Sequence, residues 1–315
     1  MPSSETIDFQ TNSRLLWRGV ILLMVVAAIG IGATALSVDF NSNPALLALV
    51  AVYAAATFFY RSIRLDEHLS QALTTVAQLL LIVVFGLLCS YAAAVTTMPY
   101  RDAELLAIDQ WLGFDRRSYV SFFTDRSWKI QLSNFVYQAM LPQLAIVPFA
   151  LIITSRMEQL QRFVAAYGIA LISTIAIFVF VPAVGAFVYF DLTPAQYATL
   201  PVEVYTPARS LDALRSGAMK TIRLNDLEGL IAFPSFHTAA AILYAWALWP
   251  IKSIRWPIAA LNVAIISTTP IGGAHYAIDV VAGSIVALGS IAASGLISRS
   301  KIELARAPLS PAQSV

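Results

Sequence analysis

Long apolar stretches alternate with short polar ones along most of the chain. A helix that crosses a bilayer needs about 20 mostly apolar residues. Eight stretches reach or approach that length, and we expect each to form a membrane-spanning helix, the second, sixth and seventh being short. These stretches are Leu16–Val38, Pro44–Tyr60, Gln71–Val95, Ser133–Thr154, Phe163–Phe190, Phe233–Trp249, Trp256–Gly272 and Tyr276–Ile297.

Composition supports the membrane assignment. Of the 315 residues, 58% are hydrophobic and only 12% are charged, whereas soluble domains carry roughly 25% charged residues. Soluble, disordered and fibrous proteins are therefore excluded. The single cysteine, Cys89, excludes an intrachain disulfide and a cysteine metal cluster. No linker or repeat divides the sequence, so we expect an all-α, polytopic membrane helix bundle that forms one integral membrane domain over residues 1–315.

The start of the chain raises the question of a signal peptide. Ala33-Thr34-Ala35 resembles a cleavage site. The apolar run before it is too long for a signal peptide and is interrupted by Arg18. We therefore expect the first stretch to be a retained membrane anchor.

The distribution of charge orients the predicted bundle. With eight spans, both termini share a side with the short connections Arg61–Ser70, Ser155–Arg162 and Pro250–Arg255. That side has eleven cations and six anions, which gives a net charge of +5. The side with the long connections has nine cations and twelve anions, which gives a net charge of −3. Because cations concentrate in cytoplasmic loops, we expect cytoplasmic termini and long loops, Thr96–Leu132 and Asp191–Ala232, on the outer face.

The first long loop opens with an amphipathic segment, Asp102–Gly113, in which Leu105, Leu106, Ile108 and Leu112 follow a helical spacing. Aromatic residues follow it and suit the membrane–water interface. The simplest interpretation is an interfacial helix that carries no chemistry.

Two polar clusters open the sixth and eighth spans. The first is Phe233–Thr238, and the second is Gly272–Asp279. Because two spans separate the clusters, both must lie on the same face of the membrane. Ionisable residues in a membrane domain are costly and are candidates for function, so these clusters predict a site on the outer face.

His275 and Asp279 are four residues apart, which places them on one side of a helix. A carboxylate bonded to one ring nitrogen fixes the tautomer and leaves the other nitrogen basic. This pattern favours a nucleophile or a general base at His275, with His237 available as a general acid. A His–Asp pair that is only structural is the alternative. The third histidine, His68, falls in an inner connection, where we expect it to be solvated.

Ser235 has the position of a helix N-cap, and a helix N-terminus favours anions. Gly272 and Gly273 would let the backbone approach an anion closely. Lys220 and Arg223 are the cations nearest to Ser235 in the second long loop, and they either bind a phosphate or belong to a solvated surface. The anion-site hypothesis competes with a cap that has no other role.

The two clusters resemble sequence motifs of a known family. Residues 234–237, Pro-Ser-Phe-His, resemble the Pro-Ser-x-His motif of the type 2 phosphatidic acid phosphatase superfamily, and His275-x-x-x-Asp279 resembles its third motif. The residues in and around these two motifs are most similar to those of the inositol phosphorylceramide synthase-like branch. Residues 102–115 also resemble bacterial members of that branch. The strong part of the resemblance covers residues 229–283.

The resemblance implies a six-helix core and a metal-independent, cofactor-free reaction through a phosphohistidine. It implies that His275 is the nucleophile, that Asp279 orients it, that His237 protonates the leaving alcohol and that Ser235 binds a phosphate oxygen. The implied substrate is a membrane lipid phosphate or phospholipid, with water or a second alcohol as acceptor. The implied location is a bacterial inner membrane with a periplasmic active site, and no nucleic-acid partner is expected.

Two departures from the phosphatase pattern stand out. Where that pattern has Ser-Arg before the third-motif histidine, this chain has Thr268 and Thr269, and the first motif, Lys with Arg-Pro seven residues later, is absent. The cation that holds the phosphate must then come from elsewhere, and Lys220 or Arg223 is the candidate. The synthase branch shares these departures, which favours a transferase or a phosphatase of that branch.

Two other function classes remain open at this point. A non-catalytic or transport protein could use the same bundle to bind an anionic lipid, and a haem or quinone protein could use His237 and His275 as ligands. A transport path requires polar residues along the spans. The few that the sequence offers are scattered, namely Gln78, Gln138, Gln143 and Asn262.

Overall fold

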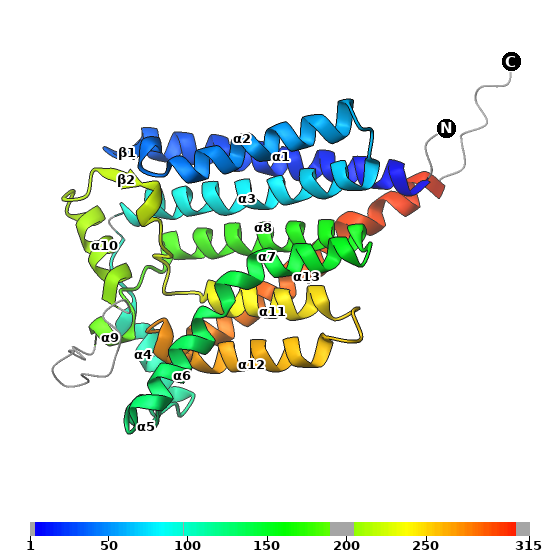
Figure 1. The fold of residues 1–315 in the computed structure, drawn as a ribbon. Coiled ribbons are helices and arrows are strands. Elements are labelled where there is room, and N and C mark those ends of the chain that lie inside the picture. The colour runs from blue at the N-terminus through cyan, green and yellow to red at the C-terminus, as the bar shows by residue number, and fades with distance from the viewer. Residues whose placement is uncertain (1–3, 97, 190–204, 307–315) are drawn as a thin grey trace, which may run out of the picture.

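The computed structural model describes residues 4–96, 98–189 and 205–306, and these residues form a bundle of helices (Figure 1). The bundle helices lie side by side, and the chain runs back and forth along them. They are α1 (Ser4–Gly32), α2 (Pro44–Ser62), α3 (Glu67–Ala94), α6 (Ser127–Gln138), α7 (Met140–Ile153), α8 (Met157–Phe180), α11 (Phe236–Leu248), α12 (Arg255–Gly272) and α13 (Ala277–Arg306).

Shorter elements gather at the end of the bundle away from the start of α1 and the end of α13 (Figure 1). Strands β1 and β2 pair there in parallel, with Val38 opposite Ile222. The elements at this end are β1 (Ser37–Asp39), η1 (Phe40–Ser42), α4 (Asp102–Trp111), α5 (Arg116–Thr124), α9 (Ala186–Tyr189), α10 (Thr206–Arg215), β2 (Thr221–Arg223) and η3 (Leu224–Asp226).

Helices α2 and α3 each begin directly after a residue whose side chain caps the helix N-terminus. The side chain of Asn43 accepts from the backbone N–H of Leu46 at the start of α2, and Pro44 occupies the first helical position. Asp66 accepts from Leu69 N at the start of α3 in the same way. Each cap satisfies a backbone donor that the helix itself leaves unpaired.

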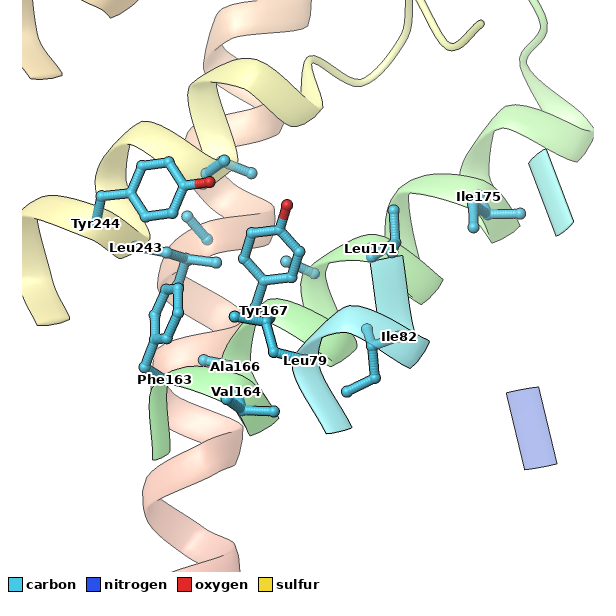
Figure 2. Close-up of a cluster of buried hydrophobic side chains, with 14 of the residues drawn as sticks. Leu79, Ile82, Phe163, Val164, Ala166, Tyr167, Leu171, Ile175, Leu243 and Tyr244 are labelled. Carbon is cyan, nitrogen blue, oxygen red and sulfur yellow. The ribbon is translucent and has the colours of Figure 1, made fainter. Parts of the chain in front are cut away.

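Helix α8 lies at the centre of the hydrophobic core. Its Phe163, Val164 and Tyr167 pack with Leu79 of α3 and Tyr244 of α11 (Figure 2). Half of the apolar window of α8 is buried inside the protein, whereas none of that of α2 is. The helices that carry the two polar clusters, α11 and α13, both pack directly on α8.

The predicted all-α bundle is confirmed. Within the described residues, six helical segments are long and apolar enough to cross a membrane: Phe9–Gly32, Pro44–Ser62, Glu67–Ala94, Ser127–Ile153, Met157–Phe180 and Ala277–Gly295. The two other predicted spans form α11 and α12, which are not among these six. Helix α11 has only 13 residues, and 1.5 Å per residue gives it about 20 Å against a hydrocarbon core of about 30 Å.

Two predicted span ends were wrong. The first span ends at Gly32 instead of Val38, because Ser37–Asp39 pairs with β2. The fifth ends at Phe180, and the predicted end, Phe190, lies outside the described residues. Pro182 explains the earlier end, since the residue before a proline is disfavoured in helical conformation.

Three of the polar residues inside the bundle form hydrogen bonds between helices. Gln143 of α7 and Asn262 of α12 exchange two hydrogen bonds, at 2.8 and 3.3 Å. Gln78 of α3 donates to the backbone oxygen of Ser13 in α1 at 3.0 Å. Such contacts join neighbouring membrane helices, so these residues act as structural links within the bundle.

Candidate active site

His275 lies two residues before α13 and is held by Asp279 in the first turn of that helix. The Nδ1 atom of His275 lies 3.0 Å from Oδ2 of Asp279, which also accepts from the backbone N–H of Tyr276 at 2.8 Å. His275 is 2% exposed and Asp279 is fully buried. With Nδ1–H donating to the carboxylate, the other ring nitrogen, Nε2, keeps its lone pair.

The electrostatic environment keeps the His275 ring neutral. Burial lowers the pKa of His275 to about 4, and the nearby Arg116 guanidinium acts in the same direction. A neutral imidazole is the form that can attack an electrophile. The geometry therefore presents one basic nitrogen whose orientation is fixed by a carboxylate.

Ser235 caps α11 and joins it to α13. Its Oγ accepts from the backbone N–H of Thr238 at 3.3 Å, as the predicted N-cap requires, and lies 3.4 Å from Nε2 of His275. The backbone N–H of Ser235 donates to the backbone oxygen of Asp279 at 3.0 Å. Gly283 permits this approach, because a Cβ there would overlap the Ser235 carbonyl oxygen.

His237, in the first turn of α11, completes the group. Its ring centroid lies 6.2 Å from that of His275, and its ring stacks on Tyr137 of α6 with a centroid distance of 4.6 Å and an interplanar angle of 18°. The structure thus brings Ser235, His237, His275 and Asp279 together at one end of the bundle.

The two glycines before His275 leave space for neighbouring side chains. A Cβ on Gly272 would overlap the ring of Tyr137, and a Cβ on Gly273 would lie 2.8 Å from the Tyr137 hydroxyl and 2.9 Å from Nε2 of His275. The glycines make room for Tyr137 and the His275 ring. The predicted approach of an anion to this backbone stays a prediction.

A second set of buried charges supports the segment around His275. Asp109 of α4 accepts from the backbone N–H groups of Ala277 and Ile278, both at 2.9 Å, and so caps the start of α13. Arg116 of α5 pairs with Asp109 at 3.1 Å and donates to the backbone oxygen of His275 at 3.1 Å. The predicted amphipathic helix is present as α4, and it contacts the candidate site through Asp109. Its place at the membrane interface stays a prediction.

Asp102, at the start of α4, holds two loops together. Its carboxylate accepts from the backbone N–H groups of Val184 and Gly185, both at 3.1 Å, and from the Tyr276 hydroxyl at 3.0 Å. Burial raises the pKa of Asp102, while these three donors lower it. Burial also lowers the pKa of the Arg116 guanidinium.

Lys220 and Arg223 lie at the strand pair. The backbone oxygen of Lys220 accepts from Ser37 N at 2.8 Å, and Arg223 forms an exposed pair with Asp226 at 3.7 Å. These contacts do not bring the two cations to Ser235 or His275, and their predicted role in phosphate binding stays a prediction. His68 is exposed, as expected, and Cys89 is buried.

Sequence reasoning missed four residues of this region: Asp102, Asp109, Arg116 and Tyr137. The sequence pattern indicated the first two. Asp102 and Asp109 are seven residues apart, and this spacing places both on the same face of the amphipathic segment as buried Leu105. For Tyr137 no local pattern existed. Its position depends on α6 packing against α12.

No group of three or more His, Cys, Asp or Glu side chains is arranged to hold a metal ion within residues 4–96, 98–189 and 205–306. In that part of the chain, the candidate site is built from two histidines, one aspartate and hydroxyl groups.

The fold and the site define a class: a polytopic membrane protein with a histidine–aspartate pair at one end of its bundle. A family model described as the PAP2 superfamily matches residues 103–293, which is more than half of the chain, so the chain belongs to the PAP2 superfamily. Members of this superfamily are typically phosphatases or phosphotransferases. Comparisons with curated proteins and with solved structures found no match.

Proposed function

We propose that this protein is an integral membrane lipid-phosphate phosphatase or phosphotransferase that works through a phosphohistidine. The observation that carries the proposal is the geometry of His275. Its Nδ1 is bonded to Asp279 at 3.0 Å, and its Nε2 faces the Ser235 hydroxyl at 3.4 Å beside His237. An oriented, neutral imidazole next to a second histidine fits nucleophilic attack followed by proton transfer.

The first step forms the phosphoenzyme. The lone pair on Nε2 of His275 attacks phosphorus, the bond from phosphorus to the leaving alcohol oxygen breaks, and that oxygen takes the bonding electrons. His237 gives the oxygen a proton. Asp279 stabilises the positive charge that develops on the His275 ring, and Ser235 donates to a non-bridging phosphate oxygen.

The second step regenerates the enzyme. The oxygen of water or of a second alcohol attacks phosphorus, the nitrogen–phosphorus bond breaks, and its electrons return to Nε2 of His275. His237 takes the proton of the attacking hydroxyl. Hydrolysis and transfer thus differ only in the acceptor, and neither step requires a metal ion.

We further assign the protein to the inositol phosphorylceramide synthase-like branch, acting on a lipid at the outer face of a bacterial inner membrane. The branch assignment is supported by the motif sequences at residues 234–237 and 275–283. It is also supported by the absence of two motifs of the phosphatase pattern. The charge difference of +5 against −3 supports cytoplasmic termini, with the site at the periplasmic end.

The decisive experiment is a phosphate-release and headgroup-transfer screen on the purified protein. Its substrates are lipid phosphates, lipid diphosphates and phosphoinositol lipids, each with and without inositol as acceptor. On a substrate that the wild type turns over, His275→Ala should abolish turnover and the acid-labile phosphoenzyme. His68→Ala is the matched control, because His68 is exposed at the start of α3.

Retained turnover in a folded His275→Ala protein would overturn the mechanism. Binding of an anionic lipid without turnover of any substrate by the wild type would instead support a non-catalytic lipid-binding protein. Sidedness has a separate test, in which a reporter fused after Val315 should report the cytoplasm.

A further inference from the structure

Tyr137 is positioned between the two histidines of the site. Its ring stacks on His237 at 4.6 Å. Its hydroxyl oxygen and Nε2 of His275 lie 2.8 and 2.9 Å from one point, the Cβ position above Gly273, so the two atoms are less than about 6 Å apart. One side chain therefore faces both groups that the proposed reaction uses.

The backbone is shaped to admit this side chain. Gly272 lies against the Tyr137 ring and Gly273 lies against its hydroxyl, and any larger residue at either position would overlap with Tyr137 or His275. Among the described residues, no protein group forms a hydrogen bond with the Tyr137 hydroxyl. Tyr137 as a whole residue is 8% exposed, and its hydroxyl lies on the same side as Nε2 of His275, at the Cβ position above Gly273.

The proposed reaction needs such a donor. Phosphoryl transfer places negative charge on the non-bridging oxygens, and oriented donors stabilise that charge. The two threonines at 268–269 supply no guanidinium. Arg116 is engaged by Asp109 and by the backbone oxygen of His275, and the described contacts of Arg223 are at η3.

We propose that the Tyr137 hydroxyl donates a hydrogen bond to a non-bridging oxygen of the phosphoryl group that His275 attacks. The inference rests on the proposed function. The distances suit it, because a reacting atom lies about 3–3.5 Å from its nucleophile and a hydroxyl lies about 2.7 Å from its acceptor. With Ser235 on one side and Tyr137 on the other, two neutral hydroxyls hold the phosphoryl group.

The test is Tyr137→Phe, which keeps the ring that stacks on His237 and removes only the hydroxyl. We expect kcat to fall about 10-fold to 100-fold, the loss typical for a hydrogen bond to a charged group. Inhibition by orthovanadate, which mimics the phosphoryl group in transfer, should weaken by a similar factor. Tyr53→Phe is the control, because Tyr53 lies in α2, far from the site in the fold.

The outcomes separate this inference from the proposed function. A folded Tyr137→Phe protein with wild-type kcat and vanadate inhibition, alongside an inactive His275→Ala, would refute the role of Tyr137 alone. Full turnover in His275→Ala would refute the proposed function itself. Should Tyr137→Phe fail to fold, Tyr137→His supplies a ring and an N–H donor in place of the hydroxyl. A folded Tyr137→His protein should keep part of the turnover and part of the vanadate inhibition, and its complete inactivity would count against the inference.

Discussion

The N-terminal helices and the site end of the bundle bury different kinds of polar residue. In the described part of α1–α3, the buried polar side chains are uncharged, namely Ser13, Thr75, Gln78 and Ser90. At the site end, the buried polar side chains include Asp102, Asp109, Arg116, His275 and Asp279. Buried charges are expensive unless each has a partner, so the site end must be ordered by specific contacts, whereas the described part of α1–α3 buries no charged side chain.

The contrast extends to the family match, which begins at residue 103 and so excludes α1–α3. Helix α2 packs mainly on α3, and none of its apolar window is buried within the protein. Its exposed apolar side chains suit contact with lipid. The difference teaches that the hydrophobic pattern, with local caps and one uncharged polar link, accounts for the N-terminal helices, while the site depends on long-range pairing of charged groups.

The largest effect should come from Asp279→Asn. The amide is neutral, so it cannot stabilise the positive charge that develops on the His275 ring as the carboxylate does. The corresponding change in a serine-protease triad lowers kcat about 10⁴-fold, and we expect a loss of that order. Steady-state turnover of Asp279→Asn against wild type measures it, and a loss under 10-fold would contradict the assigned role.

A smaller effect is expected for Arg116→Met. Removing one member of a buried ion pair leaves the other uncompensated, which typically costs 3–5 kcal/mol. The free energy of unfolding in detergent should fall by about 3 kcal/mol, and Asp109→Asn in the same chain should recover part of it. Arg61→Met, at an exposed position in α2, should change the free energy by less than 0.5 kcal/mol, as surface substitutions usually do. Equal losses in the two variants would contradict the contrast between the two regions.

The next prediction compares two glycines of α13. Gly283→Ala introduces a methyl that overlaps the Ser235 carbonyl oxygen, whereas nothing lies within 4 Å of a Cβ at Gly289. Overpacking typically costs 1–3 kcal/mol, so Gly283→Ala should lower the unfolding free energy by about that amount. Gly289→Ala should be neutral or stabilising, because alanine favours the helix. Thermal unfolding of both proteins measures the two changes. A loss of stability and of turnover only in Gly283→Ala would support the close approach of α13 to Ser235.

The smallest expected change concerns the protonation of His275. An ordinary histidine, with a pKa near 6.5, is mostly protonated at pH 5. Burial lowers the pKa of His275 to about 4, so its ring should stay mostly neutral at pH 5 and become protonated only as the pH falls through 4. Histidine-labelled NMR spectra, with the resonance assigned from His275→Asn, measure this. A titration midpoint near 6.5 would show that burial does not lower the pKa of the His275 ring.

The helical bundle and the polar clusters could be predicted because each depends on local pattern. Eight apolar runs predicted eight helical regions, and the Pro-Ser-Phe-His run at 234–237 predicted a capped helix start. The contacts of Asp109 could not be read locally, because its partners Ala277 and Ile278 are almost 170 residues away in the chain. Local helical pattern carries no information about which loop a polar face will meet.

The glycine pair shows the same limit more sharply. Gly272 and Gly273 correctly signalled a close approach at the backbone, but the sequence could not indicate what approaches. The approaching group is Tyr137, which belongs to a different helix. Span boundaries were wrong where proline or strand pairing overrode the apolar run, as at Pro182 and at Ser37–Asp39.

The strand pair at residues 37–39 and 221–223 has a consequence for shortening this protein. Removing α1 and α2 would keep the whole segment that matches the family, yet it would take β1 away from β2. The backbone groups of β2 would then form an open edge, which invites pairing with another chain. A shortened chain that starts at Glu67 should therefore self-associate through Thr221–Arg223, and a proline at Ile222 should suppress that association.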